Sequence, residues 1–361
     1  MVSSKLMAGL LCLLVTAAGA RGRQPEAEPA PAVDVTIGFA GDINLDEDWA
    51  TTKFLDETGK GIEGVFSPAL IDRMRGFDFF MVNNEFTYST RGSQIEKSYH
   101  FRARPERAGF LRDMGADLVL LANNHVFDYG EEALLDTLDT LDACGIPHVG
   151  AGRDLDGAQE PHVFTVNNRR IAFVGATAGE QYEASIHTRA AGENLPGVLE
   201  CYDPSLYLDL IRRTAAENDY VIASIHWGME YEEQYRTSQR ELAEKMVEAG
   251  ADAVIGTHTH CLQGINMIGD APVFYSLGNF WFNEKQLYSG MAELTLHVPL
   301  SESEPVTLTA ARFLPCTQYS LFTSLCGDPA EKQQILDHVA SISEGRIRFE
   351  EDGTIAACDQ P

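Results

Sequence analysis

The stretch DLVLLANNHVFDYG, Asp117–Gly130, decides the expected fold. Its apolar run Leu118–Ala122 is typical of a strand that is buried on both faces. The run ends in the polar residues Asn123, Asn124 and His125, and a helix with leucines along one face is predicted to follow. A buried strand, a polar turn and a helix in succession indicate an α/β fold.

The same order of apolar run and polar end occurs at five other places. They are 35–40 before Gly41-Asp42, 77–82 before Asn83-Asn84-Glu85, 220–225 before His226-Trp227-Gly228, 253–255 before Gly256–His260, and 273–277 before Gly278-Asn279-Phe280. Open α/β sheets bind ligands beyond the carboxyl ends of their strands, so these polar residues are expected to meet in space.

Further elements are predicted between and after these strands. Asp203-Pro204 is predicted to cap one helix, Ser238 and Glu241 to form a capping box on another, and Asn167-Asn168 to turn a hairpin. Beyond Gly290, β runs at 292–298 and 306–313 and a last helix at 330–342 are expected to form a second sheet or an edge. Residues 33–361 are thus predicted to be one domain, with a core at 33–298 and C-terminal strands and a helix at 299–361.

The composition limits the class of protein. The 361 residues are 44% hydrophobic, which allows a sizeable core, and the formal net charge is -27. An acidic surface repels phosphate backbones, so nucleic-acid binding through a basic face is not expected.

The N-terminus is expected to be an export signal. Lys5 precedes an apolar stretch, and Ala18-Gly19-Ala20 resembles a small-residue cleavage site, which predicts a signal peptide at 1–20 and a flexible spacer at 21–32. The alternative is an uncleaved membrane anchor. Either reading places the body outside the cytoplasm, extracellular or on the cell surface.

Export permits disulfides between the cysteines that remain beyond the signal. These are Cys144, Cys201, Cys261, Cys316, Cys326 and Cys358. Six cysteines allow fifteen pairings, and the local pair Cys316 and Cys326 is the first to test.

Seven strand-end residues form the candidate metal site. They are Asp42, Glu85, Asn124, His125, His226, His258 and His260. Carboxylate, amide oxygen and neutral imidazole together suit Zn, Mn or Fe better than Ca. Two such ions sharing a carboxylate are suited to an in-line displacement.

Each candidate also has an ordinary structural reading. His258 and His260 are two residues apart, so on a strand both would point to the same face. Asp128 could orient His125 or cap the following helix. Trp227 is as consistent with packing as with substrate stacking. Six other histidines lack the strand-end pattern and are set aside: His100, His148, His162, His187, His297 and His338.

The order of these motifs resembles the bacterial capsule synthesis protein CapA family. The motifs are GD at 41–42, VNNE at 82–85, ANNHVFDYG at 122–130, HWGMEY at 226–231, GTHTHCLQG at 256–264 and YSLGNF at 275–280. That family is associated with poly-γ-glutamate capsules and is similar to the calcineurin-like metallophosphoesterases. The resemblance implies a four-layer α/β/β/α sandwich with a centre of two divalent ions between its sheets.

The resemblance also implies a role for each residue. Asp42 and His260 would bind the first metal, Glu85 would bridge, and Asn124, His226 and His258 would bind the second. His125 would protonate the leaving group. Two positions depart from a metallophosphoesterase: Asn44 stands where a histidine ligand is expected, and Glu85 stands where an aspartate is expected.

Two functions follow as hypotheses. The first is a metal-dependent hydrolase or transferase that acts on an anionic extracellular polymer or its phosphorylated precursor. The second is a non-catalytic accessory that binds or exports the polymer with a degenerate metal site. Either could work with a membrane-bound capsule synthesis complex.

Overall fold

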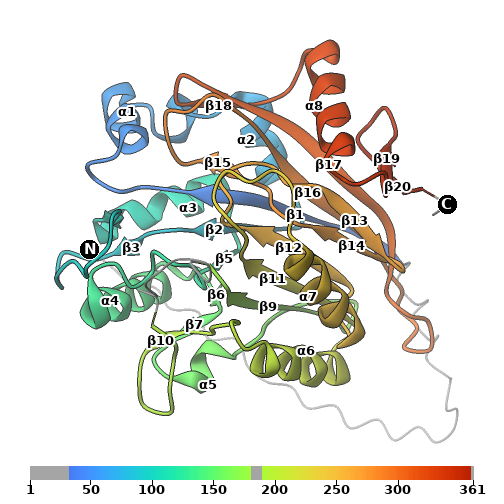
Figure 1. Ribbon diagram of the computed structural model, residues 1–361, viewed down its shortest axis with the longest axis horizontal. Coiled ribbons are helices and arrows are strands. Elements are labelled where there is room, and N and C mark those ends of the chain that lie inside the picture. The colour runs from blue at the N-terminus through green and yellow to red at the C-terminus, as the bar shows by residue number, and fades with distance from the viewer. Residues whose placement is uncertain (1–31, 180–188, 359–361) are drawn as a thin grey trace, which may run out of the picture. The chain divides into compact units, whose positions relative to one another are not determined.

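Two β-sheets lie face to face in the computed structural model, which describes residues 32–179 and 189–358. The predicted signal peptide, nearly all of the spacer and His187 lie outside these residues. From Ala32 onward the chain forms one compact unit (Figure 1).

The first sheet contains eight strands and supplies one wall of the site. Its order is β18 (Phe322–Leu325), β17 (Thr307–Tyr319), β16 (Leu287–Val298), β1 (Val33–Ile43), β2 (Phe79–Asn84), β5 (Leu118–Leu120) and β6 (His148–Val149), with β15 (Asn279–Trp281) also pairing with β1. Strands β1, β2, β5 and β6 are parallel, whereas β16, β17 and β18 add antiparallel neighbours. The C-terminal β runs therefore extend the edge of the first sheet.

The second sheet contains six strands. Its order is β13 (Ile265–Ile268), β14 (Ala271–Phe274), β12 (Ala253–Thr257), β11 (Tyr220–His226), β9 (Arg169–Thr177) and β8 (His162–Val166). Strands β9, β11, β12 and β14 are parallel. The predicted hairpin is confirmed, because β8 and β9 pair antiparallel and Asn167 and Asn168 turn between them with positive φ.

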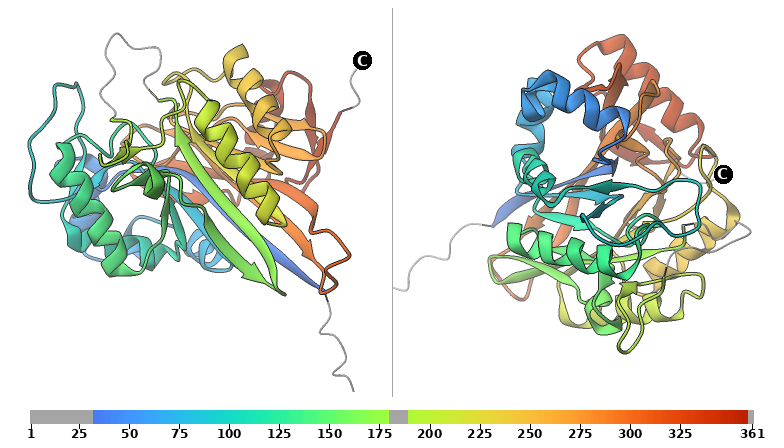
Figure 2. Two further views of the ribbon diagram at one scale, coloured as in Figure 1. Left: turned by 90° about the horizontal axis from the view of Figure 1, so that it is seen from below. Right: turned by 90° about the vertical axis from the view of Figure 1, so that its left-hand side faces the viewer.

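Helices cover the outer faces of both sheets. Against the first sheet pack α1 (Ala50–Thr58), α2 (Pro68–Arg75), α3 (Gly109–Met114) and α4 (Gly130–Cys144). Against the second pack α6 (Ser205–Glu217) and α7 (Thr237–Glu248), and Figure 2 (left) shows α6 alongside β9. A third apolar cluster, which includes Phe39 and Met81 of one sheet and Phe173 and Ile222 of the other, fills the space between the sheets. The α/β/β/α arrangement is confirmed.

The remaining elements complete the described chain. These are the helices η1 (Gly61–Gly64), η2 (Pro105–Ala108), α5 (Leu155–Ala158) and α8 (Pro329–Ser341), and the strands β3 (Thr87–Tyr88), β4 (Arg102–Ala103), β7 (Ala151–Gly152), β10 (Gly197–Val198), β19 (Ile347–Phe349) and β20 (Ile355–Ala357). Within the described ranges, no helix has both the length and the apolar character to cross a membrane.

Several local predictions are wrong in detail. The cap of α6 is Pro204 and that of α7 is Arg236, which pairs with Gln239, so neither Asp203 nor the proposed Ser238 and Glu241 box occupies its expected place. In both cases the helix begins one or two residues away from the predicted start. Strand β14 ends at Phe274, three residues early.

The described cysteines are all free thiols. Cys316 lies on β17 and Cys326 follows β18, but their sulfurs contact the carbonyl oxygens of Leu314 and Asp328 respectively, not each other. The pair selected for a first test is therefore close in the fold and unbridged.

Candidate metal centre

The first sheet contributes two buried carboxylates. Asp42 lies in β1 and Glu85 directly follows β2, and both are fully buried. The side-chain amide of Asn83, which pairs with Asp42 across the two strands, donates to Asp42 Oδ1 at 2.7 Å and to Glu85 Oε2 at 3.1 Å. The other oxygens, Asp42 Oδ2 and Glu85 Oε1, have no hydrogen-bond partner among the described residues. Buried carboxylate oxygens without a donor are suited to a cation.

The second sheet contributes three imidazoles. His226 is the last residue of β11, and His258 and His260 follow the end of β12. The expectation that His258 and His260 share a strand face is wrong, because the strand ends at Thr257. Both residues instead have positive φ, 98° and 55°, which few residues other than glycine adopt. Backbone in this region costs free energy and is concentrated at functional sites.

The two sheets bring these side chains into two overlapping groups. Glu85, His226 and His258 form one group, and Asp42, Glu85 and His260 form the other, with the possible ligand atoms of each group within 4.8 Å of one another. Glu85 belongs to both. The structure thus places this carboxylate where the family resemblance expects a bridging ligand.

Neighbouring polar groups orient the imidazoles. Asn124 Oδ1 lies 2.8 Å from His226 Nε2, and His258 Nδ1 lies 2.9 Å from the same nitrogen. On the far side, His226 Nδ1 contacts Thr257 Oγ1 at 2.9 Å, and His260 Nδ1 contacts Asn279 Oδ1 at 2.8 Å. Such contacts set the ring orientation of metal-binding histidines. They leave Nε2 of His226 and His260 facing Glu85 Oε1, at 3.7 and 3.9 Å.

His125 stands beside this group with its own carboxylate partner. Asp128 Oδ2 lies 2.6 Å from His125 Nδ1, and His125 Nε2 lies 3.9 Å from Glu85 Oε1. Helix α4 begins after Tyr129 without a side-chain cap. Of the two readings of Asp128, the structure therefore favours the one in which it orients His125.

Asn44 is buried near Asp42 but has a local role. Its carboxamide oxygen, the atom that could bind a metal, accepts the Asp46 backbone N–H at 2.7 Å. Its role as a metal ligand stays a prediction, and the group of Asp42, Glu85 and His260 contains no second imidazole among the described residues.

Burial shifts the ionisation of the centre. It raises the pKa of the Glu85 carboxyl well above its ordinary value, and the Asp42 charge raises it further. It lowers the pKa values of His226 and His258 well below their ordinary range, and neighbouring imidazoles add to the effect. Burial also raises the pKa of Asp128 to about 7, although Lys97 opposes the shift. Neutral imidazole is the form that binds a metal.

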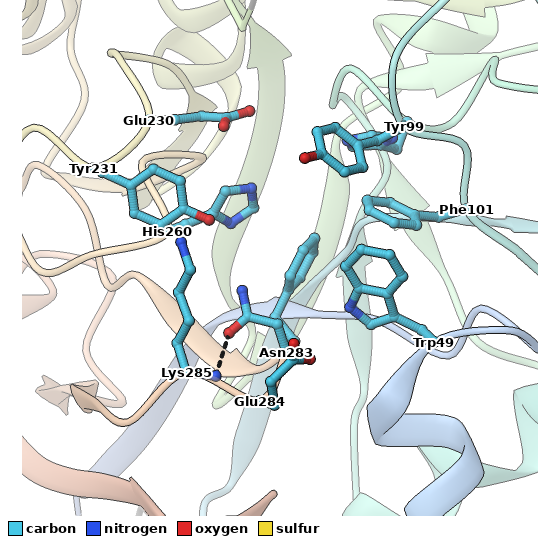
Figure 3. A pocket seen from close by; sticks show the side chains of 11 residues that line it. Trp49, Tyr99, Phe101, Glu230, Tyr231, His260, Asn283, Glu284 and Lys285 are labelled. Atoms are coloured by element: carbon cyan, nitrogen blue, oxygen red, sulfur yellow. Dashed lines mark hydrogen bonds between the residues drawn. The ribbon is translucent and has the colours of Figure 1, made fainter.

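A cavity of about 270 Å³ opens above His125 and His260. Figure 3 shows Trp49, Tyr99 and Phe101 on one side and Tyr231 and Lys285 on the other. Glu230 and Tyr231, the last two residues of the HWGMEY motif at 226–231, both line the cavity. In contrast, Trp227 is buried in the core and donates its indole N–H to the Tyr275 carbonyl, so it packs and does not stack on a substrate.

Sequence reasoning missed four contributors. Asn83, Thr257 and Asn279 lie in the same strand-end clusters as the chosen residues, so the rule that selected the ligands could also have selected them. Lys97 gave no such signal. It lies in a long loop, yet its ammonium group contacts the backbone carbonyl oxygen of Asn124 at 2.5 Å and Asp128 Oδ1 at 3.3 Å.

The discounted histidines stay apart from the centre. Within the described residues, none of His100, His148, His162, His297 and His338 belongs to either ligand group. The structure therefore brings together the seven selected residues and excludes these five, while the metal-binding role itself remains a prediction.

Known proteins resemble this chain over more than half of its length. "PGA biosynthesis protein CapA" of Bacillus subtilis is 33% identical over 69% of this chain and 64% of its own length. "Capsule biosynthesis protein CapA" of Bacillus anthracis is 32% identical over 53% of this chain and 46% of its own length. The chain thus matches less than two thirds of these relatives' own length.

More distant likenesses occur among solved structures. A Haemophilus influenzae NAD nucleotidase (NadN) has 16% identity, with an alignment that covers 86% of this chain and 63% of the nucleotidase and gives a TM-score of 0.41. A Candida albicans 5'-nucleotidase has 10% identity, with an alignment that covers 87% of this chain and 60% of the nucleotidase and gives a TM-score of 0.38.

Residues 36–284, which include every candidate ligand, match the family described as "Bacterial capsule synthesis protein PGA_cap". The chain belongs to that family.

Proposed function

We propose that this chain is an exported metal-dependent hydrolase of the phosphoester type that acts in the synthesis of a capsule polymer. The observation that carries the proposal is the double membership of Glu85 in two buried ligand groups, next to a histidine that is paired with a carboxylate. Family membership supports the capsule context, and the sequence character of residues 1–20 supports export.

The described residues fit a pair of divalent cations. Asp42 and His260 would hold one ion, His226, His258 and Asn124 would hold the other, and Glu85 would bind both. The unsatisfied oxygens Asp42 Oδ2 and Glu85 Oε1 and the neutral imidazoles favour Zn, Mn or Fe. Such ions supply Lewis-acid polarisation of the scissile group and activation of water.

His125 is proposed as the proton donor to the leaving oxygen. Asp128 accepts a hydrogen bond from Nδ1 and stabilises the protonated ring, so that Nε2 faces the centre with the proton to be transferred. The Phe101 backbone N–H donates to the same Asp128 oxygen at 2.8 Å, and the Phe101 ring lies 4.3 Å from the His125 ring. These contacts fix the acid in one orientation and limit its exposure to water.

A second candidate is a non-catalytic accessory that binds or exports the polymer. The Asn44 oxygen is taken by a local hydrogen bond, so the group of Asp42, Glu85 and His260 has one imidazole and no further ligand at the position where a full catalytic set would have another imidazole. This favours the accessory. In that case the centre would bind polymer carboxylates or serve only to stabilise the fold.

Turnover by the metal-loaded protein tests the proposal. Bis(p-nitrophenyl) phosphate and poly-γ-glutamate would be offered to the wild type, His125→Ala and His258→Ala, with the exposed His297→Ala as matched control. We expect wild-type turnover of the phosphodiester, a loss of about 100-fold or more in the first two variants, and no change in the control. Equal rates in all four proteins would discard the hydrolase. Polymer binding that persists in chelator without turnover would support the accessory.

A further inference from the structure

The cavity above the centre has aromatic walls contributed by separate parts of the chain. Trp49 precedes α1, Tyr99 and Phe101 lie in the loop before β4, Tyr231 follows β11, and Phe282 follows β15. Figure 3 shows the Trp49, Tyr99 and Phe101 side facing the Tyr231 side across an open space.

Two of these rings are exposed to an unusual degree for their size. Tyr99 is 58% exposed and Tyr231 is 46% exposed, and both are among the few large apolar side chains that the described surface leaves open. Both line this one cavity. Single exposed apolar side chains are ordinary on protein surfaces. Exposed aromatic groups gathered around a concavity, in contrast, mark a binding site.

The rings of the first wall are locked in relative orientation. Trp49 packs edge-on against Phe101 with ring centroids 5.0 Å apart, and Phe101 packs edge-on against Phe282 at 5.4 Å. Phe282 in turn lies 4.4 Å from the His260 ring. The aromatic wall is therefore continuous with the ligand group, and a group held against it lies next to the reacting centre.

The charges of the lining do not suit a run of anions. Glu230 and Glu284 are acidic, and Lys285 is the only lysine or arginine among the described residues that line this cavity. Its ammonium lies 3.4 Å from the centroid of the Tyr231 ring, which engages it in a cation–π contact. Away from the proposed ions and His125, a strand of carboxylates would find little counter-charge along these walls, whereas an uncharged ring would find flat faces and polar edges.

We propose that this cavity is a subsite for an uncharged ring carried by the substrate next to its scissile phosphoester. The shared chemistry is a flat ring face with polar edges, as in a nucleobase or a pyranose sugar. The cavity volume of about 270 Å³ is near the lower limit of about 300 Å³ for small-molecule pockets. This volume suits one ring and not a polymer segment. The statement that the bound ring lies next to a reacting centre rests on the proposed function, but the existence of the ring-binding surface does not.

Binding by the whole protein in chelator tests the subsite separately from catalysis. The probes are thymidine, methyl glucoside and sorbitol, the last an open-chain polyol without a ring, measured by calorimetry. We expect at least one ring compound to bind about tenfold tighter than sorbitol, and Tyr99→Ala and Tyr231→Ala each to weaken that binding about tenfold. The matched control is Tyr319→Ala, an exposed tyrosine outside this cavity, which should change nothing.

The outcomes separate the two proposals. Preference for thymidine or for the glucoside identifies the source of the ring. Equal affinity for ring and open-chain compounds, or ring binding unaffected by both tyrosine variants, would overturn the subsite even if phosphodiesters are hydrolysed. Ring binding without any phosphoester turnover by metal-loaded protein would retain the subsite and reject the hydrolase.

Discussion

The two sheets contribute chemically different halves of one centre. The first supplies oxygen donors, Asp42 and Glu85, from the carboxyl ends of parallel strands, and the strand register shifts beside Asp42. The second supplies nitrogen donors, and two of these, His258 and His260, follow β12 in strained backbone. Among the described residues, only Glu85 belongs to both ligand groups. Neither sheet alone brings together a full group of candidate ligands, so the packing of the two sheets is itself part of the centre.

The halves also differ in how burial affects their charge. Burial favours the neutral form of every titratable group. For His226 and His258 the neutral form is the one that binds a metal, whereas Glu85 must lose its proton to bind one. His226 and His258 are thus prepared for a cation, and the Glu85 carboxylate is stabilised only when the cation arrives.

Loss of the shared carboxylate should have the largest effect. Glu85→Gln keeps the shape but removes the charge that both groups use. Changes to residues that only orient ligands cost about 10–100-fold in metal affinity, so we expect a loss above about 100-fold for both ions. Calorimetric titration with Mn²⁺ measures it, with the exposed Glu160→Gln as control. Two ions bound at wild-type affinity would contradict a shared ligand.

Removal of one imidazole at a time should separate the groups. His258→Ala is expected to lose about one metal equivalent, and His260→Ala the other, because the two residues belong to different groups. Elemental analysis of the purified proteins measures the content, with His297→Ala as the unaffected control. If either variant retained the full wild-type content, the assignment of that histidine would be wrong.

Lys97 should affect the proton donor and not the metals. It contacts Asp128, which orients His125, so Lys97→Met is expected to lower kcat about tenfold with little change in KM or metal content. It should also shift the pH profile, and Lys97→Arg should restore part of the rate. An unchanged pH profile in Lys97→Met would reduce Lys97 to a purely structural role.

The smallest effect expected is an opposite pH response of the two halves in metal-free protein. Folding lowers the pKa values of His226 and His258, so the unfolded chain binds more protons below about pH 6.5 and the free energy of unfolding falls in acid. Folding raises the pKa of Glu85, so its contribution is present below about pH 4.5 and is lost as the pH rises.

Urea denaturation between pH 5 and 8 in chelator separates these contributions. Each group contributes a slope of at most about 1.4 kcal/mol per pH unit. Glu85→Gln should remove the loss of stability at rising pH and leave the acid-side loss intact. The same pH dependence in wild type and variant would show that Glu85 has no raised pKa.

The sequence predicted the strands and the membership of the centre more accurately than its local geometry. Buried parallel strands such as β11 and β5 have continuous apolar runs, and their polar ends mark the ligand positions. The backbone after Thr257 could not be predicted, because positive φ at His258 and His260 is imposed by tertiary contacts and runs against local preference.

The parts that were missed depend on long-range packing. Lys97 and Phe101 reach Asp128 from a loop whose path no periodicity describes. The aromatic cavity joins segments from Trp49 to Lys285, and of the described Phe, Tyr and Trp side chains that line it only Tyr231 belongs to a sequence motif. The predicted helix starts were wrong for a different reason, since Asp203 and Ser238 are plausible caps that lie one and two residues from the actual ones, Pro204 and Arg236.

Anomalous diffraction from crystals soaked in Mn²⁺ tests the central claim most directly. A centre shared between the sheets predicts two peaks about 3.5–4 Å apart, one on each side of the Glu85 carboxylate. One of them should lie against Asp42 and His260, and the other against His226 and His258. No peak at Glu85, or peaks that contact ligands of one sheet alone, would contradict it.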